Sequence, residues 1–310
     1  MAQLIKLRDY ISRYETNPFH YPTQFIRLKQ ENWRKLVKAW QEENEAELEA
    51  ERWQVAMQEG ASRSFRWNPF RKKEKERPED AVLFKRHLPS TKDQLRKYFL
   101  NQLYPFQLKW ATSTLTQVSY TEQDPYFDHQ LKYFLQHFPD IYLIMYYPIF
   151  NIKKAPVDLD ILMISPVEIE IITIVDANDE ETIVVDDDRT WRIESEIGER
   201  TIISPTISLK RTEHIVESIL QTHSLSYNIK KTVLSQDANF LFVTEPYNVS
   251  LVGNKEYNEW YQGKRELSGS LKGAQLKVVE TLLEYCLSTS VRRPEWGRDE
   301  EEESIFIIGD

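Results

Sequence analysis

The pattern of apolar positions predicts three consecutive strands between residues 141 and 176. Residues 141–149 are aromatic and aliphatic, residues 157–164 are apolar apart from two acids, and residues 167–175 are rich in isoleucine. Prolines at positions 148, 156 and 166 mark the turns. Aromatic and β-branched runs bounded by turn residues are typical of strands. We therefore expect the rest of the fold to be organised around these strands.

The middle strand carries the candidate chemistry. Asp158 and Asp160 are two residues apart, so in an unbroken strand both side chains leave the same face of the sheet. Two carboxylates on an apolar strand are costly unless they are solvated, paired or bound to a metal. A pair of strand-edge acids beside Lys153, Lys154 or water is the alternative interpretation.

Helical spacing dominates residues 1–120. Leu4, Ile5, Leu7, Ile11 and Tyr14 predict a short first helix, and longer helices are expected over residues 22–58 and from about residue 90 through residue 110. Ser90 or Thr91 is the expected cap of the last one. The two long helices are expected to pair as an antiparallel hairpin. A stripe on the first long helix suggests self-association or partner binding, and consists of Trp33, Leu36, Val37 and Trp40.

A basic connection over residues 60–78 lies between the two long helices. Arginines and lysines alternate there with aromatic rings, a composition that grips phosphates and stacks on bases. The candidate nucleic-acid contacts in it are Arg63, Arg66, Trp67, Arg71, Lys72 and Lys73. An anionic membrane surface, an acidic protein partner or a solvated loop remain alternatives.

After residue 124 the predicted elements alternate between helices and strands. An amphipathic helix over residues 124–138 precedes the three strands; short strands over residues 182–185, 190–193 and 201–204, a helix over residues 204–222 and a strand over residues 240–243 follow them. Lys210 and Arg211, early in that second helix, are further candidates for nucleic-acid contact. This order predicts an α/β three-layer core with a mixed central sheet. The expected division is a helical arm over residues 1–120, an α/β domain over residues 121–290 and an acidic tail over residues 291–310.

Composition narrows the function classes. The chain has 310 residues, 41% of them hydrophobic, and a net charge of −9, which argues against a uniformly basic nucleic-acid coat but leaves room for a basic patch. Cys286 is the single cysteine, so an intramolecular disulfide or a cysteine zinc cage is excluded. No Gly-rich phosphate loop, signal peptide or membrane-spanning run is found, and a cytoplasmic protein that needs no cofactor is expected.

Three segments together resemble the NERD (nuclease-related domain) branch of the PD-(D/E)XK nuclease superfamily, which is found in bacterial cytoplasmic proteins. Asp128-His-Gln-Leu131 resembles the helix motif, residues 158–164 (DLDILMI) resemble the acidic strand motif, and residues 204–208 (SPTIS) resemble a degenerate final motif. The resemblance covers about residues 124–243. It implies a restriction-endonuclease-like core in which Asp160, Asp158 and Asp128 occupy the catalytic positions. Asp160 and Asp128 would then be the ligands of Mg²⁺ or Mn²⁺.

The third motif of that family departs from the pattern here. With Asp160 on the family aspartate, Thr173 stands where a metal-binding glutamate belongs and Val175 where a lysine belongs. Such chemistry needs two or three acids around a divalent metal and a cation that orients the attacking water. Glu168 and Glu170 are odd numbers of residues from Thr173 and Val175, so they are expected on the opposite face of the strand.

Three hypotheses follow. The first is a catalytically degraded nuclease-related protein that binds nucleic acid (DNA or RNA) or protein. The second is an active metal-dependent nuclease with a migrated ligand set, in which Glu168 or Glu170 joins Asp160 and Asp128. The third is a structural or regulatory protein that assembles through its helical arm.

Overall fold

The computed structural model describes residues 1–58, 88–121, 124–186, 189–242 and 245–293. The chain divides into two compact units. Among the described residues, the first, the sheet unit, comprises residues 1–25 and 104–293, and the second, the arm unit, lies within residues 26–103. Within the described residues, every helix is too short or too polar to cross a membrane.

A six-stranded mixed sheet forms the centre of the sheet unit. Its order is β1-β3-β6-β7-β11-β13. The strands are β1 (Gln3–Leu7), β3 (Leu143–Tyr146), β6 (Ile161–Ile164), β7 (Glu168–Ile174), β11 (Asn228–Leu234) and β13 (Ser250–Val252). β6 runs antiparallel to both β3 and β7, and the remaining neighbours pair in parallel. The expected mixed α/β class with a mixed central sheet is confirmed.

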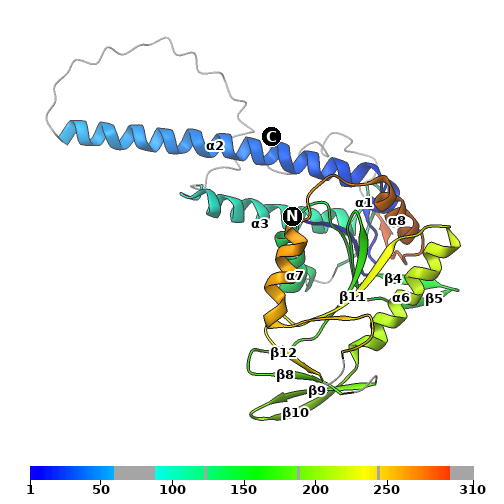
Figure 1. Ribbon diagram of the computed structural model, residues 1–310. Coiled ribbons are helices and arrows are strands. Elements are labelled where there is room, and N and C mark those ends of the chain that lie inside the picture. Colours follow the sequence, from blue (N-terminus) through cyan, green and yellow to red (C-terminus); the bar gives the residue numbers. More distant parts are fainter. Residues whose placement is uncertain (59–87, 122–123, 187–188, 243–244, 294–310) are drawn as a thin grey trace. The chain divides into compact units, whose positions relative to one another are not determined.

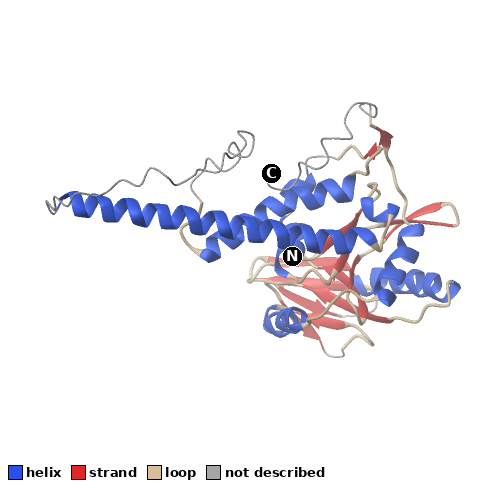
Figure 2. Ribbon diagram, turned by 90° about the horizontal axis from the view of Figure 1, so that it is seen from above, coloured by secondary structure: helices blue, strands red, loops and turns tan. Residues whose placement is uncertain are grey.

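Helices cover both faces of this sheet (Figures 1 and 2). The helices of the sheet unit, besides the ends of α2 and α3 described below, are α1 (Arg13–Thr16), α4 (Asp124–Phe127), α5 (His129–His137), α6 (Pro205–Thr222), α7 (Asn254–Glu266) and α8 (Gly273–Glu284). β7 shows the separation of the two faces. Thr173 contacts Ser208 of α6, whereas Glu170, an odd number of residues away, pairs with Lys264 of α7. The core therefore has three layers, with the strands of the sheet in the middle.

The order of helix, three strands, helix and strand is confirmed, but its last strand is not the expected one. α5, β3, β6, β7 and α6 are followed by β11, which pairs in parallel with β7. The sequence pattern missed β11 and placed this strand at residues 240–243. That segment is instead β12 (Asn239–Phe242), part of a second sheet of order β10-β9-β8-β12 (Figure 1). The other strands of the second sheet are β8 (Thr182–Val185), β9 (Thr190–Ser195) and β10 (Gly198–Ile203).

The first and second predicted strands are each interrupted. A two-stranded hairpin of β4 (Ile149–Ile152) and β5 (Ala155–Asp158) is inserted between β3 and β6. Lys153 and Lys154 make its turn with φ angles of 51° and 68°, the left-handed region used by tight hairpin turns. Asp158 therefore ends the hairpin, while Asp160 directly precedes β6. The expectation of two acids on one face of one strand is wrong.

The first residues form a strand and not the expected helix. All five residues of β1 are buried, because this strand pairs with β3 inside the unit. Lys6 is fully buried, and its Nζ lies 2.6 Å from Oε1 of Glu15. The same unit holds a small pair formed by β2 (Gln117–Val118) and β14 (Val291–Arg292).

Two long helices, α2 (His20–Gln58) and α3 (Lys92–Thr112), supply the arm unit. Within that unit Trp33 packs on Phe99 with ring centroids 5.2 Å apart, and Nε1 of Trp40 donates to the carbonyl oxygen of Pro89 across 2.6 Å. From Trp33 to Trp40 the residue number on α2 increases, while that of the contacted residue decreases from Phe99 to Pro89. This is the order expected for an antiparallel pair. Leu36 of the predicted stripe is buried as well. The basic connection and residues 294–310 lie outside the described residues, so the six predicted contacts from Arg63 to Lys73 are not placed.

Candidate functional site

One edge of the central sheet brings together Asp160 and Asp128, two of the acids that the sequence singled out. Because β1 and β3 are parallel and β6 is antiparallel to β3 and β7, the ends of β1, β3 and β7 meet the start of β6. Arg8, Tyr147, Asp160 and Thr173 lie at these positions, and Asp128 joins them from the start of α5. We call these five residues the Asp160 edge.

Asp160 is satisfied by hydroxyl groups. It is 7% exposed, Oγ1 of Thr173 donates to its Oδ1 across 2.7 Å, and Oγ1 of Thr212 donates to its Oδ2 across 2.7 Å. Thr173 comes from the neighbouring strand β7, and Thr212 comes from α6, which covers this face. Hydrogen bonds to a charged acceptor are shorter and stronger than neutral ones. Each oxygen of the carboxylate therefore has a protein donor.

Asp128 has a structural role at the start of α5. Its Oδ1 accepts a hydrogen bond from the backbone N–H of Leu131 across 2.8 Å, the geometry of a helix N-cap. The helix motif of the resemblance is thus a cap in this chain.

Tyr147, just after β3, is near enough to both Asp160 and Asp128 for their charges to act on it. Burial, followed by the nearby carboxylates of Asp160 and Asp128, raises the pKa of Tyr147 to about 12. The structure therefore does bring Asp160 and Asp128 to the same neighbourhood. Tyr147 and Arg8 both have φ angles of 45°, an uncommon conformation for residues with a side chain. At neutral pH Tyr147 stays a neutral phenol, which acts as a hydrogen-bond donor or acceptor and not as a base.

The remaining predicted ligands lie elsewhere. The side chain of Asp158 is exposed, and its main-chain oxygen accepts a hydrogen bond from Nη2 of Arg211 across 3.0 Å. Glu168 and Glu170 face α7, where Nζ of Lys264 lies 2.9 Å from Oε1 of Glu168 and 2.6 Å from Oε2 of Glu170. Their expected position on the face opposite Thr173 is confirmed.

The donor set does not fit the divalent metal of the nuclease family. Both oxygens of Asp160 face hydroxyl protons, and Asp128 is engaged as a cap. Among the residues that the structure describes, no three His, Cys, Asp or Glu side chains come together as a metal-binding group.

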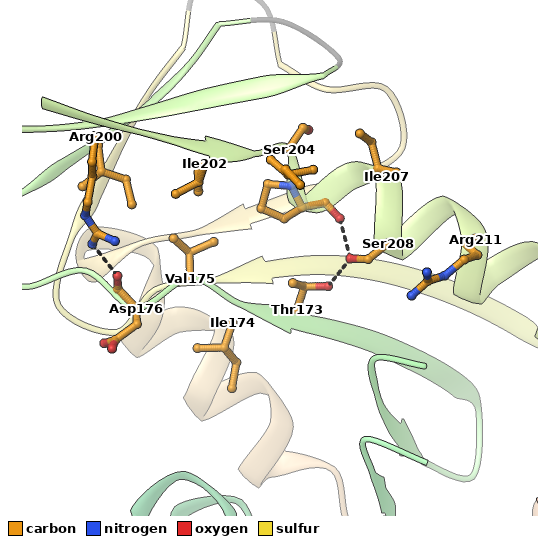
Figure 3. A pocket seen from close by; sticks show the side chains of 13 residues that line it. Thr173, Ile174, Val175, Asp176, Arg200, Ile202, Ser204, Ile207, Ser208 and Arg211 are labelled. Carbon is orange, nitrogen blue, oxygen red and sulfur yellow. Dashed lines mark hydrogen bonds between the residues drawn. The ribbon is translucent and has the colours of Figure 1, made fainter. Parts of the chain in front are cut away.

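A pocket of about 560 Å³ lies next to Asp160, between the end of β7, the second sheet and the start of α6 (Figure 3). Its lining comprises Thr173, Ile174, Val175, Asp176, Ile193, Arg200, Ile202, Ile203, Ser204, Pro205, Ile207, Ser208 and Arg211. Apolar side chains make most of the wall, and Arg200 and Arg211 lie at opposite ends of it (Figure 3). Of the predicted nucleic-acid contacts, Arg211 lines this pocket, whereas Lys210 is exposed on α6 outside the lining.

Sequence reasoning found Asp160 but missed what surrounds it. Ser208 and Thr212 are four residues apart on α6 and therefore share one helix face. This spacing was the available signal for their common direction. Arg200 and Tyr147 carried no such signal, because their positions depend on how the second sheet and the β4–β5 hairpin fold back.

No family model matches the chain, and no solved structure matches it. A segment of 47 residues is 55% identical to part of a protein described as an RNA 2',3'-cyclic phosphodiesterase from Geobacillus stearothermophilus. That match covers 15% of this chain and 15% of the relative, so the chain is similar to a small part of that protein only.

Proposed function

We propose that the sheet unit is a catalytically degraded relative of the NERD nucleases that binds nucleic acid without cleaving it. The observation that carries the proposal is the state of Asp160, whose two carboxylate oxygens accept hydrogen bonds from Thr173 and Thr212. A catalytic aspartate of this superfamily would direct the same oxygens at a metal. The order of α5, β3, β6, β7, α6 and β11 supports the relationship.

A retained nucleic-acid surface is supported by the pocket beside Asp160. Two arginines border it, and a guanidinium matches the geometry of a phosphate group. The basic connection of residues 60–78 is a second candidate contact in the proposal. The partial match to a protein named for its action on RNA makes RNA worth testing beside DNA.

The other hypotheses have less support. A migrated nuclease site needs Glu168 or Glu170 beside Asp160, yet both acids pair with Lys264 on the other face of the sheet. Assembly through the arm needs an uncovered stripe, yet Trp33 and Trp40 contact Phe99 and Pro89 of the same unit.

The test follows binding and cleavage together. The purified full chain is titrated against labelled DNA and RNA in Mn²⁺, Mg²⁺ or EDTA, alongside the Asp160→Asn variant. We expect binding without cleavage, an affinity that falls as salt rises, and no requirement for metal. Replacing Arg71, Lys72 and Lys73 together with uncharged residues is expected to flatten the salt dependence, because the protein then contacts fewer phosphates with a cation. Metal-dependent cleavage that the Asp160→Asn substitution abolishes would contradict the proposal, as would the absence of any nucleic-acid binding.

A further inference from the structure

The pocket beside Asp160 combines an apolar wall with a cation at each end. We infer that it takes one nucleoside monophosphate, either free or at the unpaired end of a strand, with the base on the apolar wall and the phosphate at Arg211. This inference rests on the proposed function and deepens it, because it makes the ligand single-stranded and names its position.

The wall suits a base. Val175 is 7% exposed and Ile193 is 1% exposed, and they form the inner part of the wall with Ile202 of β10. Pro205 and Ile207 of α6 add further apolar surface to the lining. A volume of about 560 Å³ falls within the roughly 300–1,000 Å³ of small-molecule sites. The transfer of a flat, weakly hydrated base face from water to such a wall is favourable.

The two arginines differ in what already neutralises them. Nη2 of Arg200 donates to the carbonyl oxygen of Asp176 across 2.8 Å and lies 3.4 Å from the carboxylate of Glu181. Arg211 instead donates to a main-chain carbonyl oxygen, that of Asp158. An anion therefore gains more at Arg211, whose charge is the less compensated of the two.

The other polar groups of the lining leave Arg211 as the donor for a phosphate. Ser208 and Thr173 line the pocket, but their hydroxyl protons go to the carbonyl oxygen of Pro205 and to Oδ1 of Asp160. α6 begins beside the pocket at Pro205, and Arg211 lies further along the same helix. Asp160 carries an opposing charge, but it is not part of the lining, and Thr173 of the lining is hydrogen-bonded to it.

A pocket of this kind selects against paired bases. A base inside a duplex is stacked and hydrogen-bonded, and its removal costs a few kcal/mol. An unpaired end reaches the wall without that cost.

The test uses calorimetric titration of the full chain with AMP, UMP, adenosine and inorganic phosphate, and with single-stranded and duplex octanucleotides. Ile207→Trp fills the pocket, and Ile197→Trp is its control, because Ile197 is 96% exposed and outside the lining. Arg211→Gln removes the cation, and Lys255→Gln, at an exposed position of α7, is its control. We expect Arg211→Gln to weaken AMP binding about tenfold or more, since a hydrogen bond to a charged group is worth a factor of that order. Ile207→Trp should weaken AMP binding by about tenfold or more as well, because the larger side chain occupies the site of the base. The two controls should change AMP binding less than about twofold. The Arg211→Gln substitution should leave adenosine binding unchanged.

The outcomes separate this inference from the proposed function. Oligonucleotides that bind without competition from AMP, and with unchanged affinity for Ile207→Trp, would overturn the pocket inference. The proposed function would then stand. If AMP binds with the expected variant pattern and no strand binds, the pocket inference stands and the proposed function fails. Inorganic phosphate binding as tightly as AMP would overturn the assignment of the base to the apolar wall.

Discussion

Thr173 donates a hydrogen bond to Asp160 across the neighbouring strands β7 and β6, with 2.7 Å between Oγ1 and Oδ1. Under the proposed relationship to the NERD nucleases, Thr173 stands where a second acid belongs. Two adjacent carboxylates repel each other unless a cation lies between them, whereas a hydroxyl and a carboxylate attract each other. The same strand pairing that builds a metal site from two acids thus builds a stable polar contact in this chain.

Thr212 provides the other half of that contact, so its loss should be costly. In Thr212→Val, Oδ2 of the buried Asp160 keeps no donor from α6. We expect the free energy of unfolding to fall by about 1–3 kcal/mol, the cost of an unsatisfied buried polar group. Urea denaturation measures it. Thr222→Val, at the exposed end of the same helix, is the control and should change stability by less than about 0.5 kcal/mol. Equal effects of both substitutions would show that Asp160 does not depend on Thr212.

Thr173→Glu returns an acid to the position next to Asp160. Without metal, the two carboxylates repel each other, and the variant should melt below the wild type in EDTA. With Mn²⁺ the pair gains a shared cation, so the melting temperature of the variant should rise with metal concentration. Thr173→Gln has nearly the same volume without the charge and should show no such rise. A similar response of Thr173→Gln and Thr173→Glu to Mn²⁺ would argue against a latent metal position.

Lys264 holds two carboxylates on the opposite face of the sheet. Glu170 is 1% exposed, and its Oε1 also accepts a hydrogen bond from Nε1 of Trp260 across 3.0 Å. Lys264→Met leaves Glu170 buried without its cation, which should destabilise the protein by about 3–5 kcal/mol. Lys277→Met, which removes an exposed lysine from α8, should have little effect.

The same lysine makes stability depend on pH in a defined direction. Burial alone would lower the pKa of Lys264, but the carboxylates of Glu170 and Glu168 outweigh burial and raise it above the ordinary 10.5. A raised pKa in the folded state means that the contribution is complete below about pH 10.5 and is lost as the pH rises through the folded pKa. The stability difference between the wild type and Lys264→Met should therefore shrink above that pH. Denaturation curves between pH 8 and pH 11.5 check this; a constant difference would contradict it.

Strong local patterns predicted much of the fold. The aliphatic runs of residues 141–175 and the long periodic helices were found because composition and period agree with the tertiary environment. The apolar residues of β1 predict a helix and not a strand, because a strand buried on both faces shows no alternation and its buried Lys6 depends on Glu15. β11 was missed because it carries Lys231 and Thr232, which are buried only through Glu213 and Glu170.

The acids of the candidate site were predictable from the sequence, but their partners were not. Asp160 is conspicuous as an acid in an apolar run, and the parity of Glu168 and Glu170 correctly placed them on the other face. The hairpin that separates Asp158 from Asp160 was not predictable from two-residue spacing, because Asp158 pairs with Ile149 and so belongs to a separate ladder. Partners that arrive from α6 and the second sheet are set by tertiary packing, which local periodicity does not encode.

The arm unit allows the assembly hypothesis to be tested through Trp40. Its indole Nε1 donates to the carbonyl oxygen of Pro89, a contact inside the unit. Trp40→Phe keeps an aromatic ring but removes the donor, and should lower the stability of the arm by about 1 kcal/mol. Trp40→Ala also removes the ring and should lower it further. Because Trp40 is engaged within its own unit, neither substitution should change the molar mass measured by sedimentation equilibrium. A concentration-dependent wild-type mass that falls in Trp40→Ala and not in Trp40→Phe would show instead that the ring of Trp40 contributes to an interface between copies.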